Sequence, residues 1–160
     1  MAKVVWGILC RKGILDKYTN SVSLIDVIES VQVTERKVGD EIPANEVPTI
    51  LMGMSLVYLL ERSRKDIPER PTCRVRITSP KNKQNYGPEI ELDIESSVRS
   101  RYFAGISALP ADGAGRYKFE LQEKTLDKID RTRWKVISTT VLDATTSPND
   151  PSSTEPGQPS

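Results

Sequence analysis

The sequence predicts an all-β protein, an antiparallel β-sandwich of seven to eight strands followed by a disordered C-terminal tail. Three observations lead to this prediction. Three segments alternate apolar and polar residues with a period of two, turn-forming residues separate them, and the last 18 residues contain no large apolar side chain. Because neighbouring side chains of a strand point to opposite faces, such alternation gives one buried face and one wet face, which is typical of antiparallel sheets.

The N-terminal half contains the less regular elements. Residues 4–10 are apolar on both faces and predict a buried strand. Residues 21–33 are ambiguous, since the apolar residues would form a helical stripe while the Val and Ile content favours a strand. We predict a strand there and leave open a helical turn after Asp26. Residues 48–60 form a long apolar strand, and the two prolines within 66–71 indicate a loop.

The C-terminal half contains the regular strands. A polar loop at 79–88 separates the first two alternating segments, and the glycine-containing segment 111–115 forms a turn before the third. The strands, three alternating and two less regular, are expected at residues 73–78, 89–95, 116–122, 101–109 and 134–142. Together with the N-terminal elements they define a predicted domain over residues 1–142 and a tail over residues 143–160.

Acidic residues alternate along one of these strands, at Glu89, Glu91, Asp93 and Glu95. Side chains on one face of a strand lie in a line roughly 7 Å apart, whereas calcium requires oxygens that converge on one point. We therefore predict a solvated face. If this strand pairs with the preceding one, Arg74 and Arg76 would provide cross-strand ion pairs.

The sequence around Tyr117 resembles the tyrosine corner of immunoglobulin-like domains, in which a tyrosine near a strand start bonds back to upstream backbone. The motif is Gly115-Arg116-Tyr117-Lys118-Phe119, and it follows Asp112-Gly113. Phe119 stands where antibody-type domains carry a cysteine, so the motif favours an immunoglobulin-like sandwich without the conserved disulfide. We assign Tyr117 a structural role.

Composition limits the chemistry. The chain has 160 residues, a formal net charge of +1 and no histidine, which excludes Ser-His-Asp and Cys-His catalysis and histidine-ligated metals. The two cysteines, Cys10 and Cys73, cannot complete a zinc site alone, so no cofactor or metal is expected. No apolar stretch approaches a membrane span, and we expect a cytoplasmic protein with two free thiols. Were the chain exported, a bridge between these two cysteines would be its only disulfide.

Small basic clusters lie at Arg99, Arg101, Arg131 and Arg133. Interleaved acidic residues disfavour nucleic acid as a partner, and protection of strand edges by charge is the simpler interpretation. The expected partner is an unidentified protein or a second copy of the chain.

Several short motifs carry a resemblance to a known family. They are the opening Val4-Val5-Trp6-Gly7-Ile8-Leu9-Cys10, the segment 21–28, Arg76-Ile77-Thr78-Ser79-Pro80 and Gly-x-Tyr-x-Phe at 115–119. Over residues 4–142 the chain resembles a family of uncharacterised bacterial proteins, a domain of unknown function, and departs from it at 33–47 and in the tail. The resemblance implies a compact β-sandwich and brings no activity, cofactor or site residue.

Three functions follow as hypotheses. The first is a non-enzymatic binding or scaffold module. Its candidate edge or interface is the strand at residues 48–60, with Met52, Met54 and Tyr58 as contacts; the plainer interpretation of this strand is hydrophobic core. The second is a small-ligand or carbohydrate-binding module. Its candidate ligand contacts are the aromatic residues Tyr86, Tyr102 and Trp134, with Trp6 as a further candidate. The third is a hydrolase that uses loop carboxylates, with the candidates Asp16, Asp112 and Asp127.

Overall fold

The computed structural model describes residues 2–16, 18–19, 21–33, 49–64, 66–67, 69–94, 98–126, 129 and 131–146, with the backbone alone at 49–51. These residues form strands and no helix. The strands are β1 (Lys3–Leu15), β2 (Val22–Val27), β3 (Ser30–Val33), β4 (Thr49–Glu61), β5 (Thr72–Thr78), β6 (Gln84–Tyr86), β7 (Ile90–Glu91), β8 (Arg99–Pro110), β9 (Gly115–Leu126) and β10 (Thr132–Thr146).

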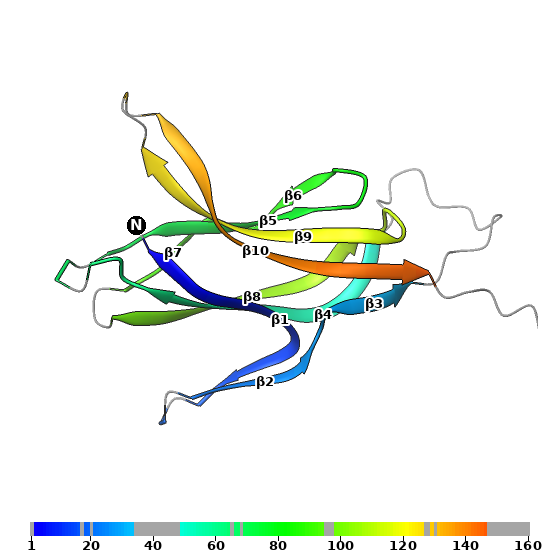
Figure 1. Cartoon of the computed structure of the whole chain (residues 1–160), viewed down its shortest axis with the longest axis horizontal. Coiled ribbons are helices and arrows are strands. Elements are labelled where there is room, and N and C mark those ends of the chain that lie inside the picture. Colours follow the sequence, from blue (N-terminus) through cyan, green and yellow to red (C-terminus); the bar gives the residue numbers. More distant parts are fainter. Residues whose placement is uncertain are drawn as a thin grey trace, which may run out of the picture.

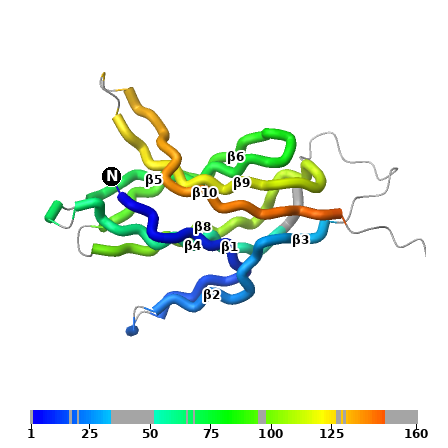
Figure 2. The backbone as a smooth tube through the Cα atoms, viewed as in Figure 1, coloured from blue at the N-terminus to red at the C-terminus, as the bar shows by residue number. Residues whose placement is uncertain are grey.

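The strands form the two sheets of a β-sandwich, which confirms the predicted fold class (Figure 1). One sheet has the order β2-β1-β4-β8 and the other β3-β10-β9-β5-β6, with β7 also pairing with β5. The described residues contain more strands than predicted because β3, β6 and β7 are only 4, 3 and 2 residues long, too short to show a period. The β1–β2 hairpin and the β9–β10 hairpin extend away from the sandwich in opposite directions (Figure 2).

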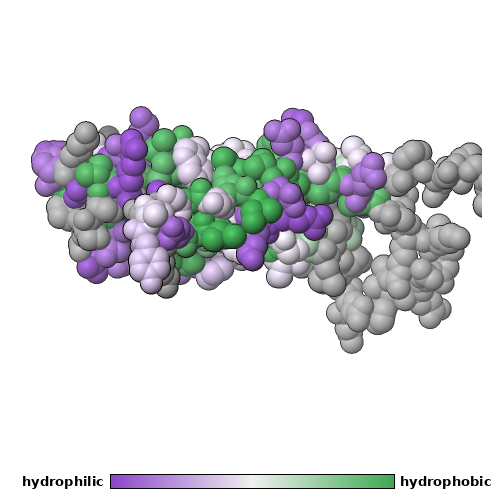
Figure 3. Space-filling view, turned by 90° about the horizontal axis from the view of Figure 1, so that it is seen from below, coloured by the Kyte–Doolittle hydropathy of each residue, from purple (hydrophilic) through white to green (hydrophobic). Residues whose placement is uncertain are grey.

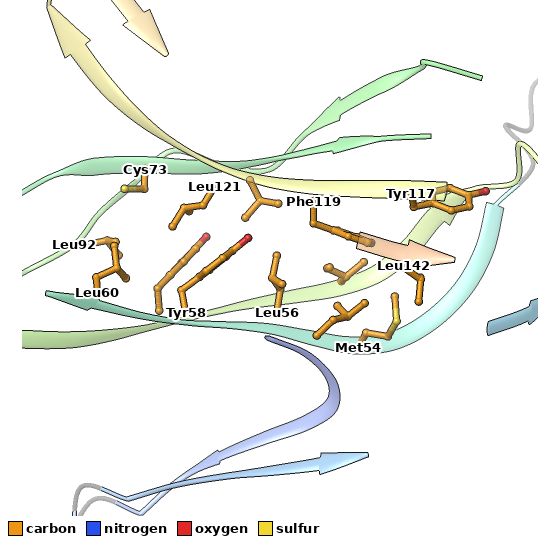
Figure 4. Packing of buried hydrophobic residues seen from close by; sticks show 14 of the residues in the cluster. Met54, Leu56, Tyr58, Leu60, Cys73, Leu92, Tyr117, Phe119, Leu121 and Leu142 are labelled. Carbon is orange, nitrogen blue, oxygen red and sulfur yellow. The ribbon is translucent and has the colours of Figure 1, made fainter. Parts of the chain in front are cut away.

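The core lies between the sheets and consists of side chains of one parity from each strand. Met54, Leu56, Tyr58 and Leu60 of β4 point toward Tyr117, Phe119 and Leu121 of β9 (Figure 4). Tyr58 also stacks on Tyr102, with ring centroids 6.4 Å apart. Gly7 permits this stack, because a Cβ at Gly7 would overlap the Tyr58 ring. Each such fully buried apolar side chain contributes about 1.5–3 kcal/mol relative to exposure.

The ambiguous segment 21–33 is two strands that belong to different sheets. β2 pairs with β1 in the four-stranded sheet, whereas β3 pairs in parallel with β10 in the six-stranded sheet. At the end of β2, Asp26 has a φ of 51°, and no helical turn follows it. The apolar residues that suggested a helical stripe are instead divided between two strands of different sheets, with Asp26 near the end of the first strand.

The strand predicted at 48–60 is β4, and the prediction that it forms an edge is wrong for its second half. From Ser55 to Glu61, β4 lies inside its sheet, between β1 and β8. Its apolar character reflects this interior position, since Val57 on the outward parity is as fully buried as Leu56 on the inward one.

The tyrosine corner is confirmed. Tyr117 Oη donates a hydrogen bond to the carbonyl oxygen of Pro110 at 2.7 Å, and the N–H of Asp112 lies 3.4 Å from the same hydroxyl. Gly113 and Gly115 have φ values of 86° and 132°, which favour glycine. The local spacing in the sequence therefore specifies this turn.

The acidic strand pairs with its predicted neighbour over two residues, Thr72 with Glu91 and Cys73 with Ile90. The predicted ion pairs do not form there. Arg76 bonds Glu120 of β9, while Glu89 pairs with Lys124 at 3.0 Å and Glu91 with Arg70 at 3.6 Å. The reason is that β6 takes the edge of β5 beside Arg76.

Strand β10 continues to Thr146, past the predicted domain boundary at residue 142. The remainder of the predicted tail lies outside the described residues, as do 34–48, Glu95 and Asp127. Cys10 and Cys73 are buried and free.

Candidate binding groove between β3 and β4

A groove of about 980 Å³ lies where the chain crosses from one sheet to the other. Its lining comes from the end of β2, the β2–β3 connection, β3, the first half of β4 and one residue of β1. These residues are Asp26, Val27, Ile28, Glu29, Ser30, Val31, Gln32, Met52, Gly53, Met54 and Arg11.

The groove follows one edge of β4. β1 and β4 pair from Lys3 with Glu61 as far as Cys10 with Ser55. Before Ser55, β4 pairs with β8 on its other side, from Thr49 opposite Pro110 to Met54 opposite Ile106. Among the described residues, no strand pairs with the second edge of β4 over Thr49 to Met54.

This edge is open because β1 turns away from β4. Beyond Cys10, β1 pairs with β2 alone, and Gly13 passes over the outer face of the four-stranded sheet. A Cβ at Gly13 would lie 2.8 Å from Phe103 Cε1 and 2.9 Å from Val57 Cγ2. Glycine thus lets the hairpin fold onto this face, and among the described strands none pairs with this edge of β4 before Ser55.

The wall of the groove opposite β4 is the β2–β3 connection, and backbone hydrogen bonds attach it to both sheets. Ile28 N–H donates to Leu9 O at 2.9 Å, in the four-stranded sheet, and Asp143 N–H donates to Glu29 O at 3.1 Å, in the six-stranded sheet. β3 pairs with β10 along one edge, and in the described part of the chain its other edge has no strand partner. Two strand edges therefore border the groove.

The floor of the groove is apolar and its rim is charged. Met54 is buried, and Met52, Ile28 and Val31 are half-buried against the core. No atom of the described residues lies within 4 Å of the position that a Cβ would take at Gly53, so this part of the chain leaves space above β4 there. The exposed charges on the rim are Arg11, Asp26 and Glu29.

Apolar surface continues from the groove onto the β1–β2 hairpin. Val27, which lines the groove, is 56% exposed, and Ile14, Leu15 and Ile25 of the hairpin are also exposed. Figure 3, seen from the side on which the hairpin lies, shows hydrophobic residues gathered along the middle of this face.

The structure brings two of the three predicted interface residues to the groove. Met52 and Met54 line it, but Tyr58 does not, because it is fully buried in the core. Burial also raises the pKa of the Tyr58 hydroxyl above its ordinary value. The sequence reasoning missed Asp26, Ile28 and Glu29, although the mixed helical and strand pattern at 21–33 marked the kink where they lie.

Two of the three predicted ligand contacts meet on the outer face of the other sheet. The guanidinium carbon of Arg74 lies 4.3 Å from the centre of the Tyr86 ring and 4.0 Å from that of Trp134. Tyr102 is buried in the core, so its prediction as a ligand contact is wrong. The pairing of strands far apart in the sequence assembles this stack.

Two of the three predicted loop carboxylates, Asp16 and Asp112, belong to the described residues. Asp16 is exposed in the β1–β2 turn and accepts hydrogen bonds from Thr19 Oγ1 at 2.6 Å and Tyr18 N–H at 2.8 Å, which lower its pKa. Asp112 is buried, and bonds from Ser79 and from Lys83 lower its pKa. The lowered pKa of each carboxyl is the opposite of the raised pKa that suits a general acid.

One carboxyl has a raised pKa, and the sequence did not single it out. Glu123 of β9 is 5% exposed and faces a hollow of about 400 Å³ that Glu69 also lines. Burial is the main cause that raises its pKa, and Glu69 adds to the effect. Its Oε1 accepts a hydrogen bond from the N–H of Ala2 at 3.4 Å, which ties the start of β1 to the six-stranded sheet.

Within the described ranges, no three His, Cys, Asp or Glu side chains are grouped so that they could hold a metal ion. The same part of the chain contains no helix with the length and apolar character needed to cross a bilayer. Comparisons with protein-family models, curated proteins and solved structures found no match to this chain.

Proposed function

We propose that this protein is a non-enzymatic protein-binding module that takes an extended segment of a partner protein along the groove between β3 and β4. One observation carries the proposal: between Thr49 and Met54, β4 pairs with β8 on one side, with a register shift after Leu51, and Met52 to Met54 line the groove on a stretch where no described strand takes the other side. An added strand would take the place that β1 leaves when it turns away from β4.

Backbone chemistry supports an extended ligand. The open edge of a strand presents N–H and C=O groups that an incoming strand can satisfy, as in peptide recognition by strand addition. The six positions from Thr49 to Met54 would accompany a segment of about 20 Å, at about 3.3 Å per residue. The groove volume of about 980 Å³ is at the upper end of the range for binding pockets.

The side chains that line the groove favour a partner segment in which apolar and polar residues alternate. The side chains that point into the groove would meet Met52 and Met54, whose flexible thioethers adapt to different apolar groups. Asp26 and Glu29 outnumber Arg11 on the rim, so a basic residue at one end of the segment would be favoured. We therefore expect bound sequences to alternate apolar and polar residues and to carry a lysine or arginine.

The test is a selection of peptides from a random library of twelve-residue sequences on the full chain, followed by affinity measurements on blocked variants. Gly53→Trp places a large side chain in the open space of the groove. Gly105→Trp is the matched control, because Gly105 is also a strand glycine with no atom within 4 Å of its Cβ position and does not line the groove.

We expect selected peptides to lose at least ten-fold in affinity for Gly53→Trp and to bind Gly105→Trp as they bind the wild type. Equal loss in both variants, or a library that yields no binder, would overturn the proposal. Pairing of two copies through the same edge would appear as a dimer in light scattering that Gly53→Trp abolishes, and would replace the peptide ligand by a second copy.

A further inference from the structure

A second, independent surface lies on the outer face of the six-stranded sheet and uses no residue of the groove. Arg74 of β5 projects from this face, since it alternates with the inward-facing Cys73 and Val75. Its guanidinium lies between the rings of Tyr86, from β6, and Trp134, from β10. Arg74 Nε donates a hydrogen bond to Gln122 Oε1 at 2.9 Å.

Among the described residues, no carboxylate pairs with Arg74. Three other cations on this face do have carboxylate partners: Arg76 pairs with Glu120 at 2.5 Å, Lys124 with Glu89 at 3.0 Å and Arg116 with Asp143 at 2.8 Å. The acceptor for Arg74 is the neutral amide of Gln122. In the part of the chain that the structure describes, its terminal nitrogens Nη1 and Nη2 form no hydrogen bond or ion pair.

This arrangement prepares Arg74 for an oxyanion. Two rings and one hydrogen bond already restrict the side chain, so ordering it on binding costs little further entropy. The planar fork of a guanidinium matches the two oxygens of a carboxylate. Its positive charge is not neutralised by the neighbouring Glu120 and Glu89, because these carboxylates pair with Arg76 and Lys124.

The surroundings of the fork suit a sugar ring. Tyr86 as a residue is 49% exposed, so it offers apolar surface beside the charge. Its hydroxyl donates to Gln84 Oε1 at 2.6 Å, which places an amide next to this ring where sugar hydroxyls could bond. We propose that the Tyr86–Arg74–Trp134 stack is a subsite for an acidic carbohydrate, in which Arg74 binds the carboxylate of a uronic acid whose ring lies against Tyr86.

The experiment uses the fluorescence of Trp134 as the reporter. The chain has two tryptophans, so Trp6→Phe leaves Trp134 as the single one. This background would be titrated with trigalacturonate, with neutral maltotriose and with hexaglutamate. We expect trigalacturonate to bind, and maltotriose and hexaglutamate to bind at least ten-fold more weakly.

Three variants distinguish binding by the guanidinium fork of Arg74 from attraction by positive charge alone. Arg74→Gln removes the charge, and Arg74→Lys keeps the charge but removes the fork. Lys118→Gln is the matched control, because Lys118 is an exposed cation of β9 on the same face. We expect a loss of about ten-fold or more for both Arg74 variants and a change within about two-fold for Lys118→Gln, with unfolding midpoints confirming that all three fold.

Two outcomes would overturn the proposed subsite, and a third would overturn its assignment to carbohydrate. An absence of trigalacturonate binding, or an equal loss in Lys118→Gln, would overturn the site. Equal binding of hexaglutamate would show that charge alone is recognised and would overturn the assignment to carbohydrate.

Discussion

At the scale of single residues, the hydroxyl of Tyr117 closes the turn between β8 and β9. It is buried and donates to Pro110 O at 2.7 Å. Beside it, Lys83 contacts Asp112 at 2.9 Å and links the same turn to the loop after β5. The Pro110 carbonyl also accepts from the N–H of Asp112 at 2.9 Å, so the hydroxyl is one of its two donors. A hydrogen bond of this kind contributes about 0.5–1.5 kcal/mol net.

We expect Tyr117→Phe to lower the free energy of unfolding by about 1 kcal/mol, because the Pro110 carbonyl loses one of its two donors and keeps the N–H of Asp112. Urea denaturation measures the change. The control is Tyr18→Phe, at a fully exposed residue, and it should stay within about 0.5 kcal/mol of the wild type. Equal values for the two variants would contradict a role for the Tyr117 hydroxyl in stability.

At the scale of elements, the kink at Asp26 divides one predicted strand between two sheets. The φ of 51° at this position bends the chain just before the β1–β2 ladder ends with Val27 opposite Cys10, after which β3 pairs with β10. The left-handed region is unfavourable for residues with a Cβ and more so for β-branched ones. Asp26 is thus part of the groove and lies two residues before Ile28, the last residue bonded to the four-stranded sheet.

We expect Asp26→Val to destabilise the protein by about 1–2 kcal/mol, and Asp26→Gly to be neutral or stabilising, since glycine adopts a positive φ without strain. The control is Ser23→Val, at an exposed position of the same strand where the φ is not positive. Urea unfolding of the three variants measures the effect. A similar cost for both valine variants would place it in the side chain rather than in the backbone.

At the scale of the whole molecule, Glu123 connects the two sheets. It lies on β9 of the six-stranded sheet and accepts from Ala2, which precedes β1 of the four-stranded sheet. Burial raises its pKa above the ordinary value of 4.5, with Glu69 adding to this, while the bond from Ala2 and the charge of Lys135 lower it. A folded chain therefore holds this proton at pH values where an unfolded chain has released it.

Stability should accordingly fall as pH rises from about 4.5 through the raised pKa of Glu123, because the unfolded state binds fewer protons in this window. Glu123→Gln keeps an oxygen acceptor for Ala2 and cannot ionise. We expect the free energy of unfolding of this variant, minus that of the wild type, to increase with pH and then level off, as measured by urea unfolding between about pH 4 and 8.

Carboxyls with lowered pKa values, Asp112 and Asp143, act in a different window. Their contribution is present above the ordinary pKa of 3.8 and is lost as pH falls below it, so it does not produce the expected slope. A difference between the variant and the wild type that is constant across the range would contradict the assigned state of Glu123.

The sequence by itself determined the fold class and the local turns. Period-two alternation states which side chains share a face, so β5 and β9 and their inward residues could be predicted from short segments. The tyrosine corner could be predicted as well, since Tyr117 and its acceptor Pro110 are seven positions apart. Both features depend on contacts within a few residues.

Tertiary structure alone decided the neighbours of each strand and therefore both proposed sites. Alternation indicates the face of a strand but not its partner, so it could not show that β4 is internal, that β3 joins β10, or that Glu123 faces a hollow. The Arg74 stack joins residues 12 and 60 positions apart, at Tyr86 and Trp134. Strand order depends on which sheet faces bury together, a property of the assembled core rather than of any segment.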